Sequence, residues 1–136
     1  DEVVARVARR ARELPAGAWV LGRGWDQNAW GDTRFPTHDR LSAAVPDRPV
    51  LLERVDGHAS LANAEAMRRA GVTRDTRDPA GGRLERAADG APTGVFVDNA
   101  QGLVGRAVPA ATRDEERRAL RAAVAELHRW GLTGVH

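Results

Sequence analysis

The chain has 136 residues, 42% of them hydrophobic and 29% charged, which is ordinary for a single globular domain with a buried core. It contains no cysteine, and this excludes disulfides, thiolate metal sites and a cysteine nucleophile. No stretch approaches the roughly 18 apolar residues of a membrane span, and no signal peptide opens the chain, so we expect a cytoplasmic protein that does not bind membranes.

The charge pattern argues against a nucleic-acid-binding protein. All 21 basic residues are arginine, yet the net charge at pH 7 is only +2. Basic and acidic residues are interspersed, as in RDTRD and RDEERR, which predicts a mixed, solvated surface. The absence of lysine also excludes, within this chain, a Schiff-base lysine or a carbamylated lysine that bridges two metal ions.

The expected elements of the N-terminal half follow from apolar periodicity and from glycine and proline breaks. In chain order they are an amphipathic helix (1–14), a strand (18–25), a polar loop (26–36), a short helix (37–44), a strand (49–55) and a second short helix (63–70).

The C-terminal half predicts a hairpin followed by helices. Strands at 83–86 and 94–97 flank an Asp-Gly turn, and a helical segment follows at 99–106. The longest helix covers 112–130, with capping-box spacing at its start and an apolar stripe along one side. A last strand is expected over 132–136. Alternating strands and helices predict an α/β fold, and the abrupt start and stop indicate one domain that is an internal piece of a larger one.

The most informative stretch is RPVLLERVDGHASLANAEA, residues 48–66. It predicts a buried strand, a turn at Asp56 and Gly57, and a helix start. His58 therefore follows the C-terminal end of a strand, where α/β folds usually place chemistry. Taken alone, such a histidine is more often a hydrogen-bonded structural residue.

Other candidate residues have structural alternatives of the same kind. Trp25, Asp26 and Trp30 stand at a strand end and in a loop, where they would line a pocket or cover the edge of the core. Asn63 has the position of a helix N-cap. Asp98 follows the hairpin and would cap the segment 99–106.

The remaining chemistry is sparse. Asp56 and Asp98 could do acid–base work if their strands are neighbours. Four histidines show no HxH or HxxxH spacing, so metal binding within this chain is not expected. Neither Ser42 nor Ser60 stands in a G-x-S-x-G nucleophile motif.

Nearly the whole chain resembles one region of the amidohydrolase-3 family, metal-dependent hydrolases that include N-substituted formamide deformylases. The order and spacing of the matching segments agree throughout. These segments are GRGWDQNAW (22–30), FPTHDRLSAAVPDRPVLLERVDGHASLANAEAMRRAGV (35–72), DPAGGRLERAADGAPTGVFVDNA (78–100) and GLTGVH (131–136).

The resemblance implies a fragment of a TIM-type barrel with an inserted β-hairpin, from an enzyme that hydrolyses amide-like C–N bonds at a metal centre. It implies a divalent metal, for which we expect zinc, with a small-molecule amide as substrate. The family's HxH pair would precede this region, and its lysine and later ligands would follow it. No residue of this chain is therefore predicted as a metal ligand.

The same resemblance ranks the site residues. DGH at 56–58 matches the family motif, which makes His58 the expected catalytic contact. Trp25 and Asp26 match its GWD motif, and Asn63 matches a family asparagine, so these are expected substrate contacts. Asp98 is a further candidate, although the family more often has Glu there, and Asp reaches about one C–C bond less far.

Two functions remain open from the sequence. The chain is either part of a metal-dependent amidohydrolase, inactive alone, or a non-catalytic binding module that keeps the family's sequence. A partial barrel would expose strand edges, so self-association is expected as well.

Overall fold

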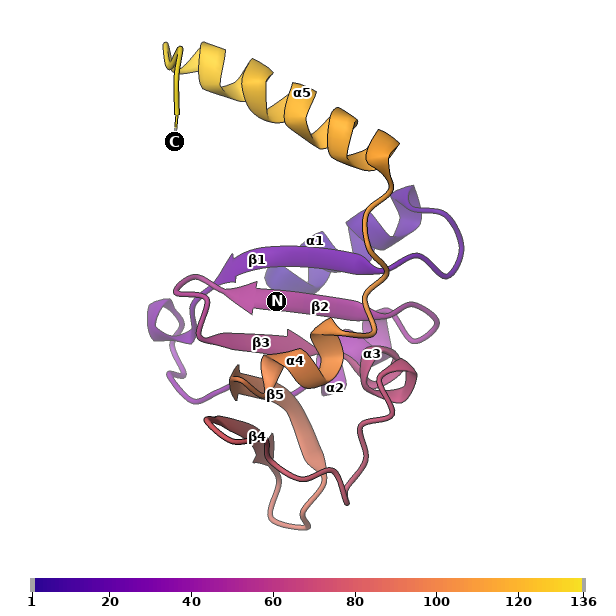
Figure 1. Ribbon diagram of the computed structural model, residues 1–136. Coiled ribbons are helices and arrows are strands. Elements are labelled where there is room, and N and C mark those ends of the chain that lie inside the picture. The colour runs from indigo at the N-terminus through magenta and orange to yellow at the C-terminus, as the bar shows by residue number, and fades with distance from the viewer. Residues whose placement is uncertain (1, 136) are drawn as a thin grey trace.

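The computed structural model describes residues 2–135 as a five-stranded mixed β-sheet with helices on both faces (Figure 1). The strands are β1 (Val20–Trp25), β2 (Val50–Arg54), β3 (Ala59–Ala62), β4 (Gly82–Arg86) and β5 (Pro92–Asp98), in the spatial order β1-β2-β3-β5-β4. β1 and β2 are parallel, and the other three pairings are antiparallel. β1, β2 and β5 therefore point the same way, and their ends lie along one side of the sheet, termed the C-terminal rim below.

The helices are α1 (Glu2–Glu13), the 3-10 turn η1 (Gln27–Ala29), α2 (Asp39–Ala44), α3 (Ala64–Arg69), α4 (Gln101–Gly105) and α5 (Arg113–Arg129). α1 and α2 cover one face of the sheet, and α3 and α4 cover the other, since each pair shares a cluster of buried side chains with the strands. In Figure 1, α4 lies in front of the strands and α1 lies behind them.

Alternating side chains of the central strands supply both cores. Val50 and Leu52 of β2 pack under α1 and α2, whereas Leu51 between them packs on the opposite face. β5 does the same with Val95 and Phe96, which are both fully buried. This period of two is the pattern of strands covered on both faces, and it makes the register of the sheet specific.

A bulge at the end of β1 turns Trp25 into the core. The register with β2 shifts between Arg23 and Trp25, and Gly24 between them has φ +90°, a conformation that side-chain-bearing residues rarely adopt. Trp25 is only 5% exposed as a result, and its Nε1–H donates to the carbonyl of Leu52 at 2.8 Å.

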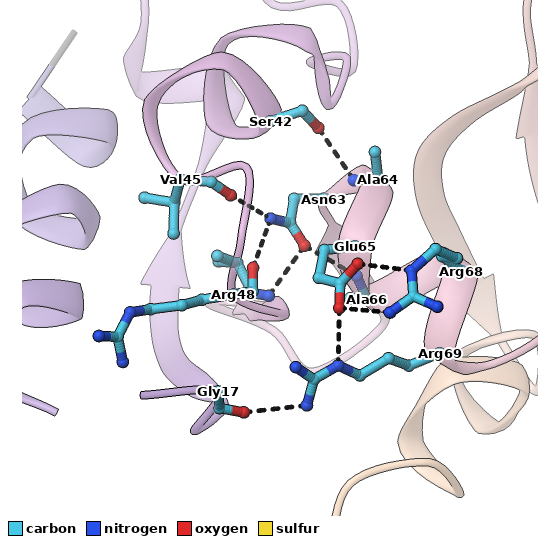
Figure 2. Close-up of polar contacts among 11 residues, drawn as sticks. Gly17, Ser42, Val45, Arg48, Asn63, Ala64, Glu65, Ala66, Arg68 and Arg69 are labelled. Atoms are coloured by element: carbon cyan, nitrogen blue, oxygen red, sulfur yellow. Dashed lines mark hydrogen bonds and ion pairs between the residues drawn. The ribbon is translucent and has the colours of Figure 1, made fainter. Parts of the chain in front are cut away.

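Asn63 fixes the junction between β3 and α3 (Figure 2). Its Oδ1 accepts the backbone N–H groups of Val50 at 2.9 Å and Ala66 at 3.0 Å. Its Nδ2 donates to the carbonyls of Val45 at 2.9 Å and Arg48 at 2.8 Å. The side chain is fully buried, so these four bonds tie β2, the loop before it and α3 together.

Glu65, in the first turn of α3, forms a second polar cluster beside Asn63 (Figure 2). Its carboxylate accepts hydrogen bonds from Arg68 at 2.7 and 2.8 Å and from Arg69 at 2.9 Å. Arg69 also donates to the carbonyl of Gly17, which connects α3 to the loop before β1. The two guanidinium groups lower the pKa of Glu65 from 4.5 to about 2.

Most expected elements are confirmed within a few residues. α1, β1, α2, β2, α3, the β4–β5 hairpin and α5 all form where apolar periodicity places them. The predicted capping box of α5 is present, with reciprocal contacts between Thr112 and Glu115. The α/β class is therefore confirmed, but the pairing is mixed, whereas the strands of a TIM barrel are all parallel.

Three local expectations are wrong. The sequence analysis expected no strand between His58 and the helix at 63, but Ala59–Ala62 is β3, at the centre of the sheet. Asp98 does not cap the next helix, because α4 begins only at Gln101 and its N-cap is Ala100. Residues 132–135 form no strand, and His136, like Asp1, lies outside the described residues.

α5 projects away from the sheet (Figure 1), and among the residues described it buries no side chain. Its predicted apolar stripe is consequently exposed, as at Leu120 and Val124. Across positions 2–135, none of the helices combines the length and apolar character needed to cross a membrane.

Replacing Asn63 with alanine should lower the free energy of unfolding by about 3 kcal/mol or more, because it leaves buried donors and acceptors of three segments unpaired. Urea denaturation measures this. The control is Asn99→Ala, which removes one exposed hydrogen bond to Ala80 and should cost less than about 1 kcal/mol. Equal costs for the two variants would contradict the role given to Asn63.

Glu65 should make stability acid-sensitive. A carboxylate with a lowered pKa contributes stability that is fully present above the unfolded value of 4.5 and is lost as pH falls toward 2. The fall in melting temperature between pH 5 and pH 2 should therefore be smaller in Glu65→Gln than in the parent. Glu126→Gln, which removes an exposed ion pair with Arg129, should keep the parent's full acid sensitivity. An unchanged fall in Glu65→Gln would contradict this assignment.

Candidate active site

A continuous series of polar contacts follows the C-terminal rim from β1 to β5. Asp26 lies 4.0 Å from a guanidinium nitrogen of Arg54, and another nitrogen of Arg54 lies 3.2 Å from Asp56. Asp56 accepts the backbone N–H of His58 at 3.0 Å, and the imidazole of His58 meets Asp98 at 2.9 Å. The rim thus brings together four charged residues and one histidine that are up to 72 positions apart in sequence.

The turn between β2 and β3 presents His58 to solvent. Gly57, with φ +75°, donates its N–H to the carbonyl of Arg54 at 3.0 Å, and β3 begins immediately after His58. His58 therefore stands at the tip of a tight hairpin, with 74% of its side chain exposed. The expected position just past a strand end is confirmed, although the element that follows it is a strand.

Asp98 holds the imidazole in one orientation. Its Oδ1 is 2.9 Å from Nδ1 of His58, and its backbone N–H donates to the carbonyl of His58, also at 2.9 Å. Asp98 has φ +49°, a left-handed conformation that is uncommon for a residue other than glycine. Because Nδ1 is occupied by Asp98, Nε2 is the ring nitrogen left for another partner.

The carboxylates around His58 raise its pKa above the ordinary 6.5. The hydrogen bond that the ring donates to Asp98 is the largest cause, followed by the negative charges of Asp98 and Asp56. Desolvation and the positive charge of Arg54 act in the opposite direction. The arrangement therefore favours the imidazolium form over the neutral ring, and in that form Nε2–H is available as a donor.

Gln101, the first residue of α4, forms hydrogen bonds to both the turn and the second strand of this hairpin. Its Nε2 donates to the carbonyl of Gly57 at 2.9 Å, and its Oε1 accepts the hydroxyl of Ser60 at 2.5 Å. Neither Gln101 nor Arg54 is among the residues predicted for the site from the sequence. No motif marks Gln101. For Arg54 the available signal was a charged residue at the end of a mainly apolar strand, which indicates that its side chain faces other charged groups.

Trp25 and Asp26 border a groove of about 680 Å³ that is lined by α1, β1, the loop after β1 and α2, with Leu52 and Leu61 of the neighbouring strands. The Trp25 ring stacks on Trp30 at a centroid distance of 6.2 Å and meets Phe35 edge-on at 6.4 Å. Trp25 itself is buried, so it mainly covers the edge of the core, whereas Trp30 is 37% exposed and lines the groove. Both alternatives for these two tryptophans therefore hold in part.

The rim does not include Asn63. β3 runs away from the rim, so Asn63 at its end lies on the opposite side of the sheet, with its oxygen and nitrogen engaged as described above. The rim is also not a metal centre by itself. Among positions 2–135, no three His, Asp or Glu side chains are grouped so as to hold a metal ion.

Comparison with known proteins places the chain in a family. The family model described as "Amidohydrolase family" matches residues 1–136. The chain is 39% identical over its full length to "Putative amidohydrolase YtcJ" of Bacillus subtilis (strain 168), and the match covers 26% of that protein. It is 34% identical over 104 residues to "N-substituted formamide deformylase" of Arthrobacter pascens, which is 76% of this chain and 19% of that enzyme. The chain thus spans about a quarter or less of these relatives.

Two crystal structures share the fold. They are of uncharacterized metal-dependent hydrolases from Pyrococcus horikoshii OT3 and Pyrococcus furiosus, with TM-scores of 0.63 and 0.61 and sequence identities of 21% and 23%. Each match covers 98% of this chain, but only 24% and 25% of the respective hydrolase.

Replacing Asp98 with asparagine should lower the pKa of His58, because it removes the largest cause of the upward shift. The measurement is an NMR titration of the His58 ring, assigned by its absence in His58→Ala. Asp75→Asn, which changes an exposed aspartate outside the rim, is the control and should leave the titration unchanged. A His58 pKa in Asp98→Asn equal to that of the parent would show that the contact does not govern its charge.

Proposed function

Because the chain belongs to the amidohydrolase family, we propose that the whole protein is a metal-dependent hydrolase of amide-like C–N bonds and that this chain supplies part of its substrate pocket. The observation that carries the proposal is the exposed His58 imidazole, which Asp98 holds from one side so that Nε2 is left for a substrate. This geometry supports a substrate contact for His58, where the sequence alone leaves a structural role equally open.

The proposed role of His58 is to bind the amide carbonyl. In the imidazolium form its Nε2–H donates a hydrogen bond to the carbonyl oxygen, and this bond strengthens as negative charge develops on that oxygen in the transition state. Asp98 contributes by keeping Nδ1 engaged, which fixes the direction of Nε2. Asp56 contributes a second negative charge that favours the protonated ring.

We assign the groove beside β1 to the substituent of the amide. Its volume of about 680 Å³ lies within the usual range for small-molecule sites. Trp30 offers an aromatic face there, and Asp26 offers a carboxylate at the rim, so an amide with an apolar or aromatic substituent fits this lining. Asn63 is left out of the pocket because its polar atoms are used within the domain.

The metal and the barrel are proposed to belong to other parts of the protein. The rim lacks a three-ligand group, so no step is assigned to a metal through these residues. The mixed sheet also lacks the all-parallel pairing of a barrel. In a protein about four times as long as this chain, both features would come from segments beyond the five strands.

The test compares the whole metal-loaded protein with its His58→Ala variant on a panel of N-formyl and N-acyl amides. We expect kcat/KM to fall about a hundredfold, which corresponds to about 2.7 kcal/mol of transition-state stabilisation, with metal content unchanged. His128→Ala serves as the matched control, since this exposed histidine belongs to α5, which projects away from the sheet (Figure 1). Wild-type kinetics in His58→Ala, with a lower melting temperature, would make His58 structural and refute the proposal.

A further inference from the structure

Arg54 stands between the two ends of the rim and has no role in the function proposed so far. We propose that Arg54 is a positioning residue, which ties the end of β1 to the β2–β3 turn and thereby sets the direction in which His58 faces a substrate. This inference rests on the proposed function of His58, and it adds a residue that acts through the turn without touching the substrate.

The contacts of Arg54 reach both sides of the rim. One terminal nitrogen lies 3.2 Å from Oδ2 of Asp56, and the other lies 4.0 Å from Oδ1 of Asp26. Asp56 uses its other oxygen, Oδ1, to accept the N–H of His58. The guanidinium thus fixes the carboxylate that fixes the His58 backbone. A planar fork with separate donors suits two carboxylates, which a lysine ammonium cannot bridge in the same way.

The backbone of Arg54 takes part in the same turn. Its carbonyl accepts the N–H of Gly57, which closes the turn, and the next residue, Val55, donates its N–H to the carbonyl of Trp25. The Arg54 side chain and the main chain of the adjacent Val55 therefore both connect the end of β1 to the hairpin. A displacement of Arg54 would move the turn and change the direction of the imidazole, while the ring and the backbone carbonyl of His58 stay bonded to Asp98.

Burial of Arg54 is costly and argues against a purely stabilising role. Only 18% of its side chain is exposed, its guanidinium carbon lies 5.8 Å from the centre of the Phe35 ring, and its Nε is buried with no hydrogen-bond partner within the described chain. Desolvating a charge and one of its donors offsets much of what the ion pairs contribute. An arginine held in this way is better explained by the geometry that it imposes.

The charge of Arg54 gives this inference a distinctive readout. The charged groups that act on His58 are Asp98 and Asp56, which favour the protonated ring, and Arg54, which disfavours it. Removing the positive charge also leaves Asp56 without its cation. Both effects raise the pKa of His58, whereas a mere loosening of the fold would weaken the contact with Asp98 and lower it.

The experiment uses the whole protein with Arg54→Gln, Arg54→Lys and a matched control, Arg86→Gln. Arg86 lies on β4 and, like Arg54, is a largely buried arginine that pairs with an aspartate. Its side chain is 29% exposed, and its partner is Asp78. The His58 ring is titrated by NMR, and kcat and KM are measured across pH on the best amide of the panel. Arg54→Gln should raise the His58 pKa and lower kcat about tenfold with little change in KM. Arg54→Lys should keep the His58 pKa near that of the parent and still lower kcat, and Arg86→Gln should change neither.

The inference is overturned if the His58 pKa of a folded Arg54→Gln variant is unchanged or lower, or if both Arg54 variants keep the parent's kcat. Should Arg54→Gln fail to fold, Arg54→Lys decides alone, because an unchanged kcat in that variant refutes the positioning role. The NMR titration does not depend on catalysis. Failure of the proposed function, seen as full activity in His58→Ala, is therefore distinguishable from failure of the coupling between Arg54 and His58.

Discussion

The parallel pairing of β1 with β2 is the constraint on which the rest of the arrangement depends. Parallel neighbours cannot be joined by a tight turn, so the chain crosses back through η1 and α2 before it enters β2. The two antiparallel pairings that follow then return β5 to the same direction. As a result, β1, β2 and β5 end at the same side of the sheet, and the residues that follow them share one rim.

The stretch from Asp56 to Asn63 has an exposed histidine near one end and a fully buried asparagine at the other. The four residues of β3 separate His58 from Asn63, so the two residues lie at opposite ends of this strand. Asn63 is buried and joins several backbone segments, whereas His58 is exposed and contacts a single carboxylate with its ring. Residues only five positions apart in one short motif therefore have different physical surroundings.

Local sequence signals predicted much of the fold because each has a local cause. The Asp-Gly turn of the β4–β5 hairpin and the capping box at Thr112 act within a few residues. β3 was missed because ASLA is short and contains two alanines, which have low strand propensity, so its pairing depends on neighbours on both sides. The position of His58 past a strand was foreseeable for the same local reason. The contact of His58 with Asp98 was not foreseeable, because it depends on the pairing of β5 with β3. A resemblance in sequence gives no distances between residues.

A crystal structure of the whole, metal-loaded protein with a non-hydrolysable amide analogue would test the central claim most directly. The account predicts that Nε2 of His58 lies about 3 Å from the oxygen that stands in for the amide carbonyl, while Nδ1 remains on Asp98. An analogue bound in the active site with His58 turned away from it, or with the imidazole covered by another part of the protein, would contradict the account.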